Sequence, residues 1–265
     1  MMIGAAVQRR PREGSWSRPD YALMREAGIE WVRMGFRPPF TDATLATTTP
    51  EFGEQEREVE ALARHGLRVM GYTPFPGGDP DIGGGYPAWG GPMGSEGYFA
   101  AYEEVCAWLG RRFSGVAGAW QVANELNHGD WNGGLTPDQG VEFLKRGARG
   151  LKRANPGALV GFNMAGFGEV AMGMYRALFP PDAGGAADFD YIGADGYQAP
   201  ELWPDKFAQL AAITDRPIVV QEFGYASAGA TLTAEQMATI AFGSARDRCK
   251  YRAWNPTWGD RPHTP

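Results

Sequence analysis

Two glutamates follow short apolar runs in this sequence, and their spacing points to a chemical reaction. Glu125 ends the run WQVANE (120–125), and Glu222 lies in VVQEFG (219–224). A side chain that directly follows a buried strand of a parallel barrel projects at the C-terminal mouth, where active sites are built. Two carboxyl groups about 5 to 5.5 Å apart can cleave a glycosidic bond with retention of configuration. The pair therefore predicts glycoside hydrolysis.

Such a reaction needs opposite electrostatic surroundings for its two carboxyl groups. The nucleophile must stay ionised, and the general acid must hold a proton, which a neighbouring anion favours. Arg33, in WVRMG (31–35), could keep Glu222 ionised, and the hydroxyl group of Tyr197, after IGADG (192–196), could donate to the same carboxylate.

The elements that would position these residues are apolar runs separated by amphipathic stretches, which is typical of parallel βα units. The sequence predicts a (βα)8 TIM barrel, and 265 residues suit one such barrel. The expected strands are 3–7, 31–34, 68–72, 118–123, 159–163, 191–194, 218–221 and 251–254. Helix starts are expected at Thr49–Pro50 and Thr136–Pro137, and helix ends at Gly28 and Gly66.

The C-terminal end leaves little room for an eighth helix. Only residues 255–265 follow the last expected strand, so we expect the barrel to lack a complete eighth helix. Either the chain is truncated, or its tail or a partner covers the last strand. No domain boundary is visible, and we expect residues 1–265 to form a single catalytic domain.

A long segment after the third expected strand has a different composition. Residues 73–97 are rich in Gly and Pro, contain Trp89 and carry no Lys or Arg. The segment is too long for an ordinary βα loop and leaves the barrel on the face where active-site loops gather. It is expected to form a wall of the substrate cleft, with a flexible excursion as the alternative.

The sequence resembles the clan A glycoside hydrolases, the (βα)8 group that includes cellulases, mannanases, xylanases and β-glycosidases. The resemblance is carried by Asn124–Glu125 after the fourth strand, Glu222 after the seventh, Arg33 after the second and Tyr197 after the sixth. It implies that Glu125 is the acid/base, that Glu222 is the nucleophile and that Asn124 donates to the sugar 2-hydroxyl group. The same resemblance implies that Arg33 and Tyr197 position Glu222.

Two positions depart from the pattern of that clan. Asp195 stands where many members have a histidine, and Ala123 stands where many have a bulky residue. Asp195 could bond a substrate hydroxyl group or form a structural pair with an arginine, and the sequence leaves both open.

Aromatic side chains suit sugar binding because a pyranose face stacks on a flat ring. The resemblance matches Trp254 to the tryptophan beneath the reacting sugar, while Trp89 and Trp131 lie in expected loops, as does Trp203. Each loop tryptophan could equally serve ordinary packing. His128, just beyond Glu125, could line the cleft or be structural.

Composition excludes several other classes of function. The net charge is −6 and no long Lys/Arg run occurs, which disfavours nucleic acid as a partner. No apolar run is long enough for a membrane span. The three histidines do not pair at metal-ligand spacing, so we expect no metal and no cofactor. Cys106 and Cys249 are expected to be free thiols.

These observations predict a retaining glycoside hydrolase with a carbohydrate substrate, endo-acting on a β-1,4-linked polysaccharide or oligosaccharide. We expect a monomer. The N-terminal residues show no signal peptide, which fits a protein that stays in the cell or one whose signal has been removed. The alternative is a barrel that binds carbohydrate without cleaving it.

Overall fold

The computed structural model describes residues 4–6, 21–76, 88–129, 131–180, 188–196 and 203–223. Its strands are β1 Gly4–Ala6, β2 Trp31–Gly35, β3 Arg68–Tyr72, β4 Ala117–Val122, β5 Leu159–Phe162, β6 Ile192–Gly196 and β7 Ile218–Phe223. Its helices are α1 Tyr21–Glu26, α2 Pro50–Arg64, the short 3-10 helix η1 Ala88–Gly90, α3 Glu96–Arg112, α4 Pro137–Ala154, α5 Glu169–Leu178 and α6 Trp203–Ala211.

The strands are parallel and follow one another in chain order. β1 to β5 form one hydrogen-bonded sheet, and β6 pairs with β7. β6 continues the order beside β5, because the Asp190 amide donates to the Val160 carbonyl at 2.7 Å and Ala165 forms a parallel bridge with Asp195. Strand and helix alternate throughout, which is the βα order that the sequence predicts.

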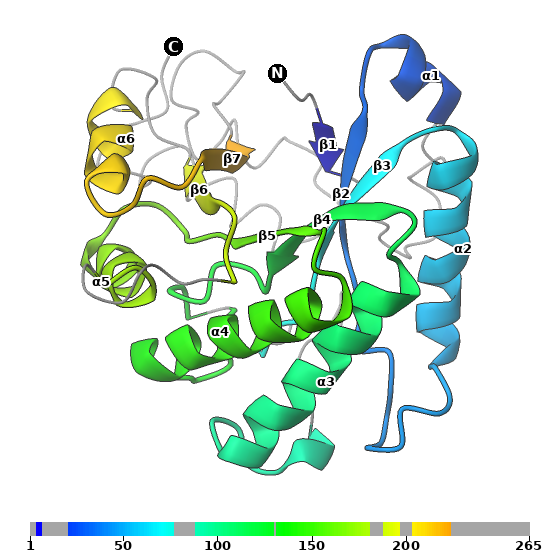
Figure 1. Ribbon diagram of the computed structural model, residues 1–265, viewed down its shortest axis with the longest axis horizontal. Coiled ribbons are helices and arrows are strands. Elements are labelled where there is room, and N and C mark those ends of the chain that lie inside the picture. The colour runs from blue at the N-terminus through cyan, green and yellow to red at the C-terminus, as the bar shows by residue number, and fades with distance from the viewer. Residues whose placement is uncertain are drawn as a thin grey trace, which may run out of the picture.

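The strands curve so that the last described one faces the second. The Glu222 carboxylate on β7 lies 2.7 Å from the Arg33 guanidinium on β2, and the Gln221 amide nitrogen lies 3.9 Å from the Met70 sulfur on β3. Helices α2 to α6 surround the strands on the outside (Figure 1). The fold is thus of the predicted (βα) barrel class. The expected eighth strand, 251–254, lies outside the described residues.

The outward faces of the strands pack against the helices. Trp120 of β4 is fully buried, and its ring lies 5.4 Å from that of Phe36. Phe36 in turn contacts Phe113, at the end of α3, at 4.8 Å. Between α3 and α4, the rings of Tyr102 and Phe143 stack at 3.6 Å. These aromatic contacts connect α3 to the sheet and to α4.

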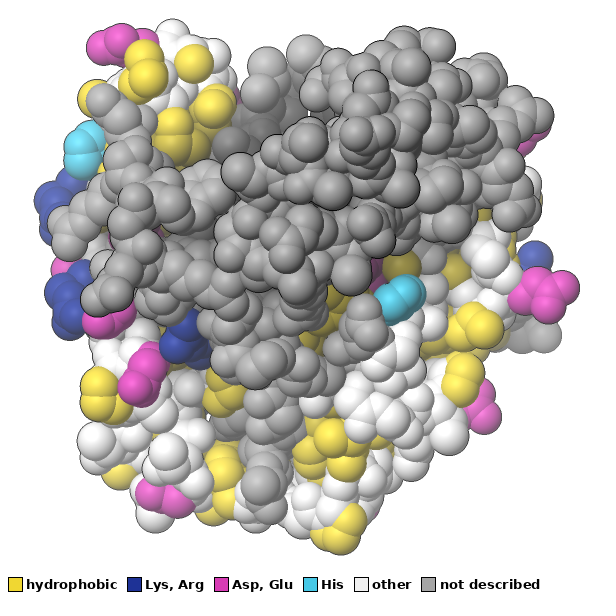
Figure 2. All heavy atoms as spheres, turned by 180° about the vertical axis from the view of Figure 1, so that it is seen from behind, with side chains coloured by type: hydrophobic (Ala, Val, Ile, Leu, Met, Phe, Trp, Pro, Cys, Tyr) yellow, Lys and Arg dark blue, Asp and Glu magenta, His cyan; other side chains and the backbone are white. Residues whose placement is uncertain are grey.

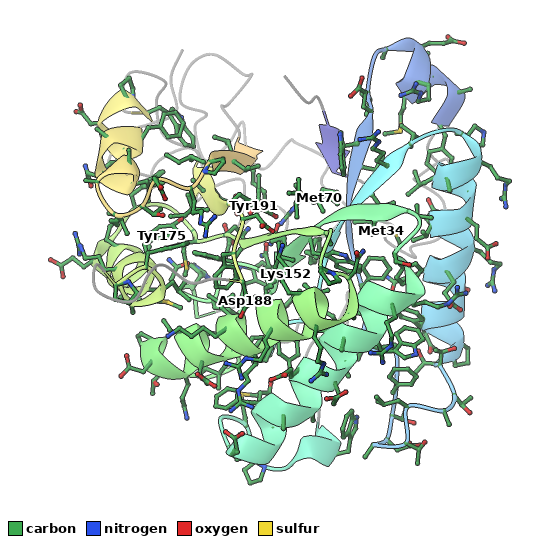
Figure 3. The ribbon with its side chains drawn as sticks, in the orientation of Figure 1. Met34, Met70, Lys152, Tyr175, Asp188 and Tyr191 are labelled. Carbon is green, nitrogen blue, oxygen red and sulfur yellow. The ribbon has the colours of Figure 1, made fainter. Side chains whose placement is uncertain are left out.

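The inward faces carry larger side chains opposite glycines. A Cβ atom at Gly35 would overlap the ring of Tyr72, and one at Gly161 would overlap the ring of Tyr191. The Tyr191 hydroxyl group donates to the Trp120 carbonyl at 2.8 Å. Tyr191 and Met70 lie within the curve of the strands (Figure 3). The lumen is therefore a packed interior, as in other small barrels.

The helix signals expected from sequence agree with the structure. Thr49 accepts from the Phe52 amide at the start of α2, and Thr136 forms a reciprocal capping box with Gln139 at the start of α4. Gly28 and Gly66 have φ angles of 79° and 70°, values that glycine adopts readily.

An irregularity in the β6–β7 pairing turns Glu222 into the barrel. Ala194 pairs with Val220, but the next pair is Asp195 with Glu222, so Gln221 is an extra residue on β7. Such a bulge locally breaks the alternation of a strand and re-aims a side chain. Gln221 and Glu222 are consecutive, yet both make interior contacts.

The surface agrees with the absence of a long basic run in the sequence. Where side chains are described, Lys and Arg occur on the face in Figure 2 in small groups beside Asp and Glu. Within the described ranges, no helix combines the length and apolarity of a membrane span.

The barrel interior allows a direct test of the packing. Gly161→Ala should lower the free energy of unfolding by about 1–3 kcal/mol, because its methyl group overlaps the Tyr191 ring. The matched control is Gly173→Ala in α5, where a Cβ atom meets nothing within 4 Å. This control should raise stability by about 0.5–1 kcal/mol. Denaturant unfolding measures both, and equal effects would contradict the described lumen.

Candidate active site

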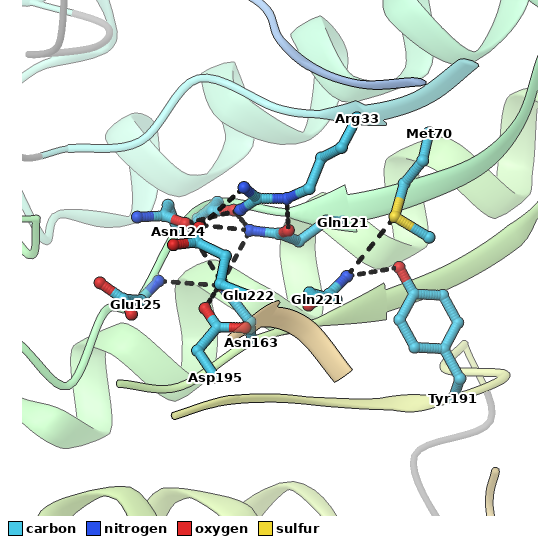
Figure 4. A network of polar contacts seen from close by, with 11 residues as sticks. Arg33, Met70, Gln121, Asn124, Glu125, Asn163, Tyr191, Asp195, Gln221 and Glu222 are labelled. Carbon is cyan, nitrogen blue, oxygen red and sulfur yellow. Dashed lines mark hydrogen bonds and ion pairs between the residues drawn. The ribbon is translucent and has the colours of Figure 1, made fainter. Parts of the chain in front are cut away.

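Four charged or ionisable side chains converge at the C-terminal ends of the strands. They are Arg33 on β2, Glu125 after β4, Asp195 on β6 and Glu222 on β7. One carboxylate oxygen from each of the three acids lies within 4.8 Å of the others. Figure 4 shows this network of polar contacts. Glu125 and Glu222, which the sequence separates widely, are thus close enough to flank one bond.

Arg33 is the centre of the hydrogen-bonding network. Its Nε donates to Gln121 Oε1 at 2.8 Å, its Nη2 donates to Asn124 Oδ1 at 2.9 Å, and its Nη1 lies 2.7 Å from Glu222 Oε1. The guanidinium also lies 4.7 Å from the centre of the Tyr72 ring. Burial acts to lower the pKa of Arg33, but the nearby carboxylates outweigh it and raise that pKa above its usual value. Arg33 therefore stays charged.

Asn124 is held in one amide orientation. Its Oδ1 accepts from Arg33 at 2.9 Å, from Asn163 at 3.1 Å and more weakly from Gln121 at 3.3 Å. Because each of these partners offers N–H groups, the Asn124 oxygen must face them. The Asn124 Nδ2 group is then left as the donor available to a ligand.

Asn163, which directly follows β5, is a site residue that the sequence interpretation missed. Its Oδ1 accepts from Gln121 Nε2 at 2.8 Å and from the Glu125 amide at 2.9 Å. Its Nδ2 donates to Asn124 and to Asp195 Oδ2. The signal was present, since Asn163 follows an apolar run in the same way as Glu125 does.

The backbone around Asn124 adopts an unusual conformation. Ala123 and Glu125 have φ angles of 57° and 45°, a left-handed region that non-glycine residues rarely adopt. The Ala123 amide donates to Thr73 Oγ1 at 2.8 Å, and that hydroxyl group lies 2.6 Å from the Tyr102 hydroxyl. Strained residues persist only when their surroundings hold them, and they gather at functional sites.

The two glutamates differ in their surroundings. Glu125 is buried, and this burial together with the nearby Glu222 raises its pKa to about 7, although Arg33 acts in the opposite direction. Glu222 is about one-quarter exposed and forms an ion pair with Arg33. One carboxyl group therefore favours the protonated form, while the other lies beside a permanent cation.

Trp131 lies beside Glu125. The Trp131 side chain acts to lower the pKa of the Glu125 carboxyl group, and its ring meets that of Phe75 edge-on at 5.4 Å. Phe75 belongs to the segment 73–97, so the start of that segment adjoins the site. His128 is exposed, and its amide donates to the Glu125 carbonyl at 2.8 Å.

The other tryptophans are placed differently or are not described. Trp89 lies in η1 and packs at the edge of the hydrophobic core. The expectation that Trp203 is in a loop is wrong, because it begins α6 and contacts Phe167 and Phe207. Tyr197 and Trp254 lie outside the described residues, and their assigned roles stay predictions.

The close spacing of the three carboxyl groups is one that a metal site could also have. Metal ligands must be deprotonated, and a calcium ion takes six to eight oxygen ligands. Here Arg33 already pairs with Glu222, and burial favours the protonated forms of Glu125 and Asp195. The donor set therefore suits the binding of protons better than that of a cation.

Comparison with solved structures identifies the fold. No family model and no curated protein significantly matches the sequence. A glucosidase from Croceicoccus marinus superposes with a TM-score of 0.60 at 18% identity, covering 84% of this chain and 52% of that one. An exo-β-1,4-mannosidase from Opitutaceae bacterium strain TAV5 gives 0.60 at 17% identity, covering 84% and 46%.

A xylanase from Cellvibrio japonicus, solved as a thermostable mutant, also superposes with a TM-score of 0.60. It is 15% identical, and the match covers 95% of this chain and 79% of the xylanase. This chain spans about half the length of the first two structures. At these identities the comparison shows the fold alone: the chain folds like these glycoside hydrolase structures, as a (βα) barrel, which confirms the expected fold class.

Glu125 should make the stability of the protein depend on pH. With its pKa raised from 4.5 to about 7, the folded state binds more protons than the unfolded chain between these values. The free energy of unfolding must then fall as pH rises through this range. Glu125→Gln removes this pH-dependent loss. The difference in unfolding free energy between the variant and the wild type should therefore be more favourable to the variant at pH 8 than at pH 5, by on the order of 1–3 kcal/mol.

Denaturant unfolding at both pH values measures the difference. Glu60→Gln, at an exposed position of α2, is the matched control and should show little pH-dependent difference from wild type. An equal effect of Glu125→Gln at the two pH values would show that the Glu125 carboxyl group is not perturbed.

Proposed function

We propose that this protein is a retaining glycoside hydrolase, with Glu222 as nucleophile and Glu125 as general acid and base. The observation that carries the proposal is the placement of these carboxyl groups within 4.8 Å of one another at the ends of β4 and β7. This is close to the separation of about 5 to 5.5 Å in retaining enzymes and shorter than that in inverting ones, which must fit a water between the groups.

In the first step, Glu222 attacks the anomeric carbon and the glycosidic bond breaks. Arg33, 2.7 Å from the Glu222 carboxylate, keeps the nucleophile charged and oriented. Glu125 gives its proton to the leaving oxygen, which departs as an alcohol. The raised pKa of about 7 suits this task, because the carboxyl group still carries its proton near neutral pH.

In the second step, water attacks the same anomeric carbon and releases Glu222. Glu125, now a carboxylate, takes a proton from that water and returns to its starting form. Two inversions at one carbon give overall retention. Asn124 supports both steps. Its Oδ1 faces the three side chains that donate to it, so its Nδ2 group points away from them and can donate to the sugar 2-hydroxyl group.

The proposed substrate is a β-1,4-linked polysaccharide or oligosaccharide, cleaved internally. Support comes from the likeness in fold to a xylanase and to an exo-β-1,4-mannosidase, the second of which bears on the β-1,4 linkage and not on internal cleavage. The contact of Phe75 with Trp131, beside Glu125, further supports a wall of the cleft built by the start of the segment 73–97. Aromatic rings at that place could stack on sugars beyond the cleavage point.

Azide can distinguish the two carboxyl groups by the product that it forms. Glu125→Ala should still be glycosylated by aryl β-glycosides with good leaving groups, and azide should then release a β-glycosyl azide. Glu222→Ala should lose hydrolysis and, if rescued, form an α-glycosyl azide by a single inversion. Nuclear magnetic resonance of the products identifies the anomer.

The matched control for this experiment is Glu60→Ala, at an exposed position of α2, which should keep wild-type turnover. Unchanged hydrolysis by Glu222→Ala would overturn the assignment of the nucleophile. Binding of many polysaccharides without release of reducing sugar would favour a non-catalytic carbohydrate-binding barrel instead.

The pH profile should report the general acid. Because Glu125 must be protonated to assist departure, kcat/KM should fall as pH rises above about 7, approaching tenfold per pH unit. The residual activity of Glu125→Gln should lack this alkaline limb, because the amide does not titrate. An alkaline limb that persists unchanged in this variant would assign it to another group.

A further inference from the structure

A third carboxyl group lies in the site and has no role in the mechanism described above. Asp195 on β6 is fully buried, and its carboxyl group lies within 4.8 Å of those of Glu125 and Glu222. The bulge in β7 sets its backbone directly opposite Glu222 in the β6–β7 register. Three ionised acids at this spacing would repel one another strongly.

The amide of Asn163 holds one side of the Asp195 carboxyl group. Because Asn163 Oδ1 accepts from Gln121 Nε2 at 2.8 Å and from the Glu125 amide at 2.9 Å, its Nδ2 must point the other way. That Nδ2 donates to Asp195 Oδ2. Asp195 is thus held by the same side chain that fixes the backbone of Glu125.

The other oxygen of Asp195 has a different environment. Asp195 Oδ1 is buried and has no hydrogen-bond partner among the described residues. A buried, ionised carboxylate is strongly destabilising when one of its oxygens accepts no hydrogen bond. A proton on Oδ1 would remove that charge and give Asp195 a donor, and the Glu125 carboxyl group within 4.8 Å can accept its hydrogen bond.

We propose that Asp195 is a positioning residue that keeps its proton throughout the reaction and donates it in a hydrogen bond to Glu125. A protonated Asp195 accepts from Asn163 with one oxygen and donates with the other. It therefore supports Glu125 without adding a negative charge to the site.

Burial and several neighbouring groups change the pKa of Asp195. Burial is the largest effect, and Glu222 and Glu125 add to it, so the pKa of Asp195 is raised well above its usual value. Arg33 acts in the opposite direction. Tyr175 from α5 donates its hydroxyl proton to the Gly193 carbonyl at 2.7 Å and offers no cation to Asp195.

This role rests on the proposed hydrolytic function of Glu125. In the first step Glu125 becomes a carboxylate, and a neutral donor beside it stabilises that charge and makes Glu125 a stronger acid. In the second step the same hydrogen bond holds the Glu125 carboxylate as it takes a proton from water. The Asp195 proton is not transferred in either step.

Asp195→Asn tests the charge of this group, because an amide can reproduce both hydrogen bonds of a protonated acid. We expect the alkaline limb of the pH profile of kcat/KM to stay at the wild-type position. If Asp195 were ionised, this variant would remove an anion beside Glu125. The pKa of Glu125 would then fall, and the alkaline limb would shift to lower pH by about one unit or more, which would overturn the proposal.

Asp195→Ala removes the donor and serves as the companion variant. The carboxylate form of Glu125 loses a hydrogen bond, so the alkaline limb should move to higher pH and kcat should fall by about tenfold. Activity and pH profile identical to wild type would show that Asp195 does not position Glu125.

Infrared spectroscopy tests the protonation of Asp195 without any substrate. At about pH 8, well above the usual pKa of an aspartate, the wild-type minus Asp195→Asn difference should contain the carbonyl band of a protonated carboxyl group. Asp138→Asn, at an exposed position of α4, is the control and should remove only carboxylate bands. Loss of carboxylate bands alone from Asp195→Asn would refute the proposal. This result is independent of hydrolysis, so it separates failure of the Asp195 role from failure of the proposed function.

Discussion

The ion pair between Arg33 and Glu222 is the interaction on which the site depends. It joins β2 to β7 across the barrel interior at 2.7 Å, and the same guanidinium holds Gln121 and Asn124 on β4 and its following turn. A buried cation without its carboxylate is strongly destabilising, so the two strand ends must stay in register for the barrel to be stable. The geometry that would serve catalysis therefore also holds β2 and β7 together across the barrel interior.

This arrangement requires irregular backbone around the site, which neighbouring side chains stabilise. Ala123 and Glu125 occupy a left-handed backbone region, and the bulge at Gln221 interrupts the pairing of β7. Thr73 and Asn163 accept the amide hydrogens of Ala123 and Glu125, which compensates the turn after β4. These supports hold the side chains of the site in place before the reaction. A preorganised site of this kind needs no reorganisation during the reaction.

Burial divides the carboxyl groups into two kinds. Glu222 keeps partial contact with solvent and has a cation beside it, whereas Glu125 and Asp195 lie deeper, where the protonated form costs less. Environments that push the pKa values of neighbouring acids apart are the means by which acid and nucleophile coexist near neutral pH. The proposed neutral state of Asp195 extends this principle to a third carboxyl group.

The alternation of apolar runs with capped helices predicted the βα order, because the spacing of buried residues and the caps at Thr49 and Thr136 are local properties. The position of Glu125 and Glu222 after apolar runs also indicated the reaction. Only the tertiary structure showed that Asn163 joins the site, that Asp195 lies beside Glu125 and Glu222, and that Trp203 packs in a helix. It also decided the distances between the carboxyl groups and the burial that raises the pKa of Glu125 and of Asp195. Distance and burial depend on the curvature of the sheet and on the bulge in β7, which arise from contacts between strands far apart in the chain.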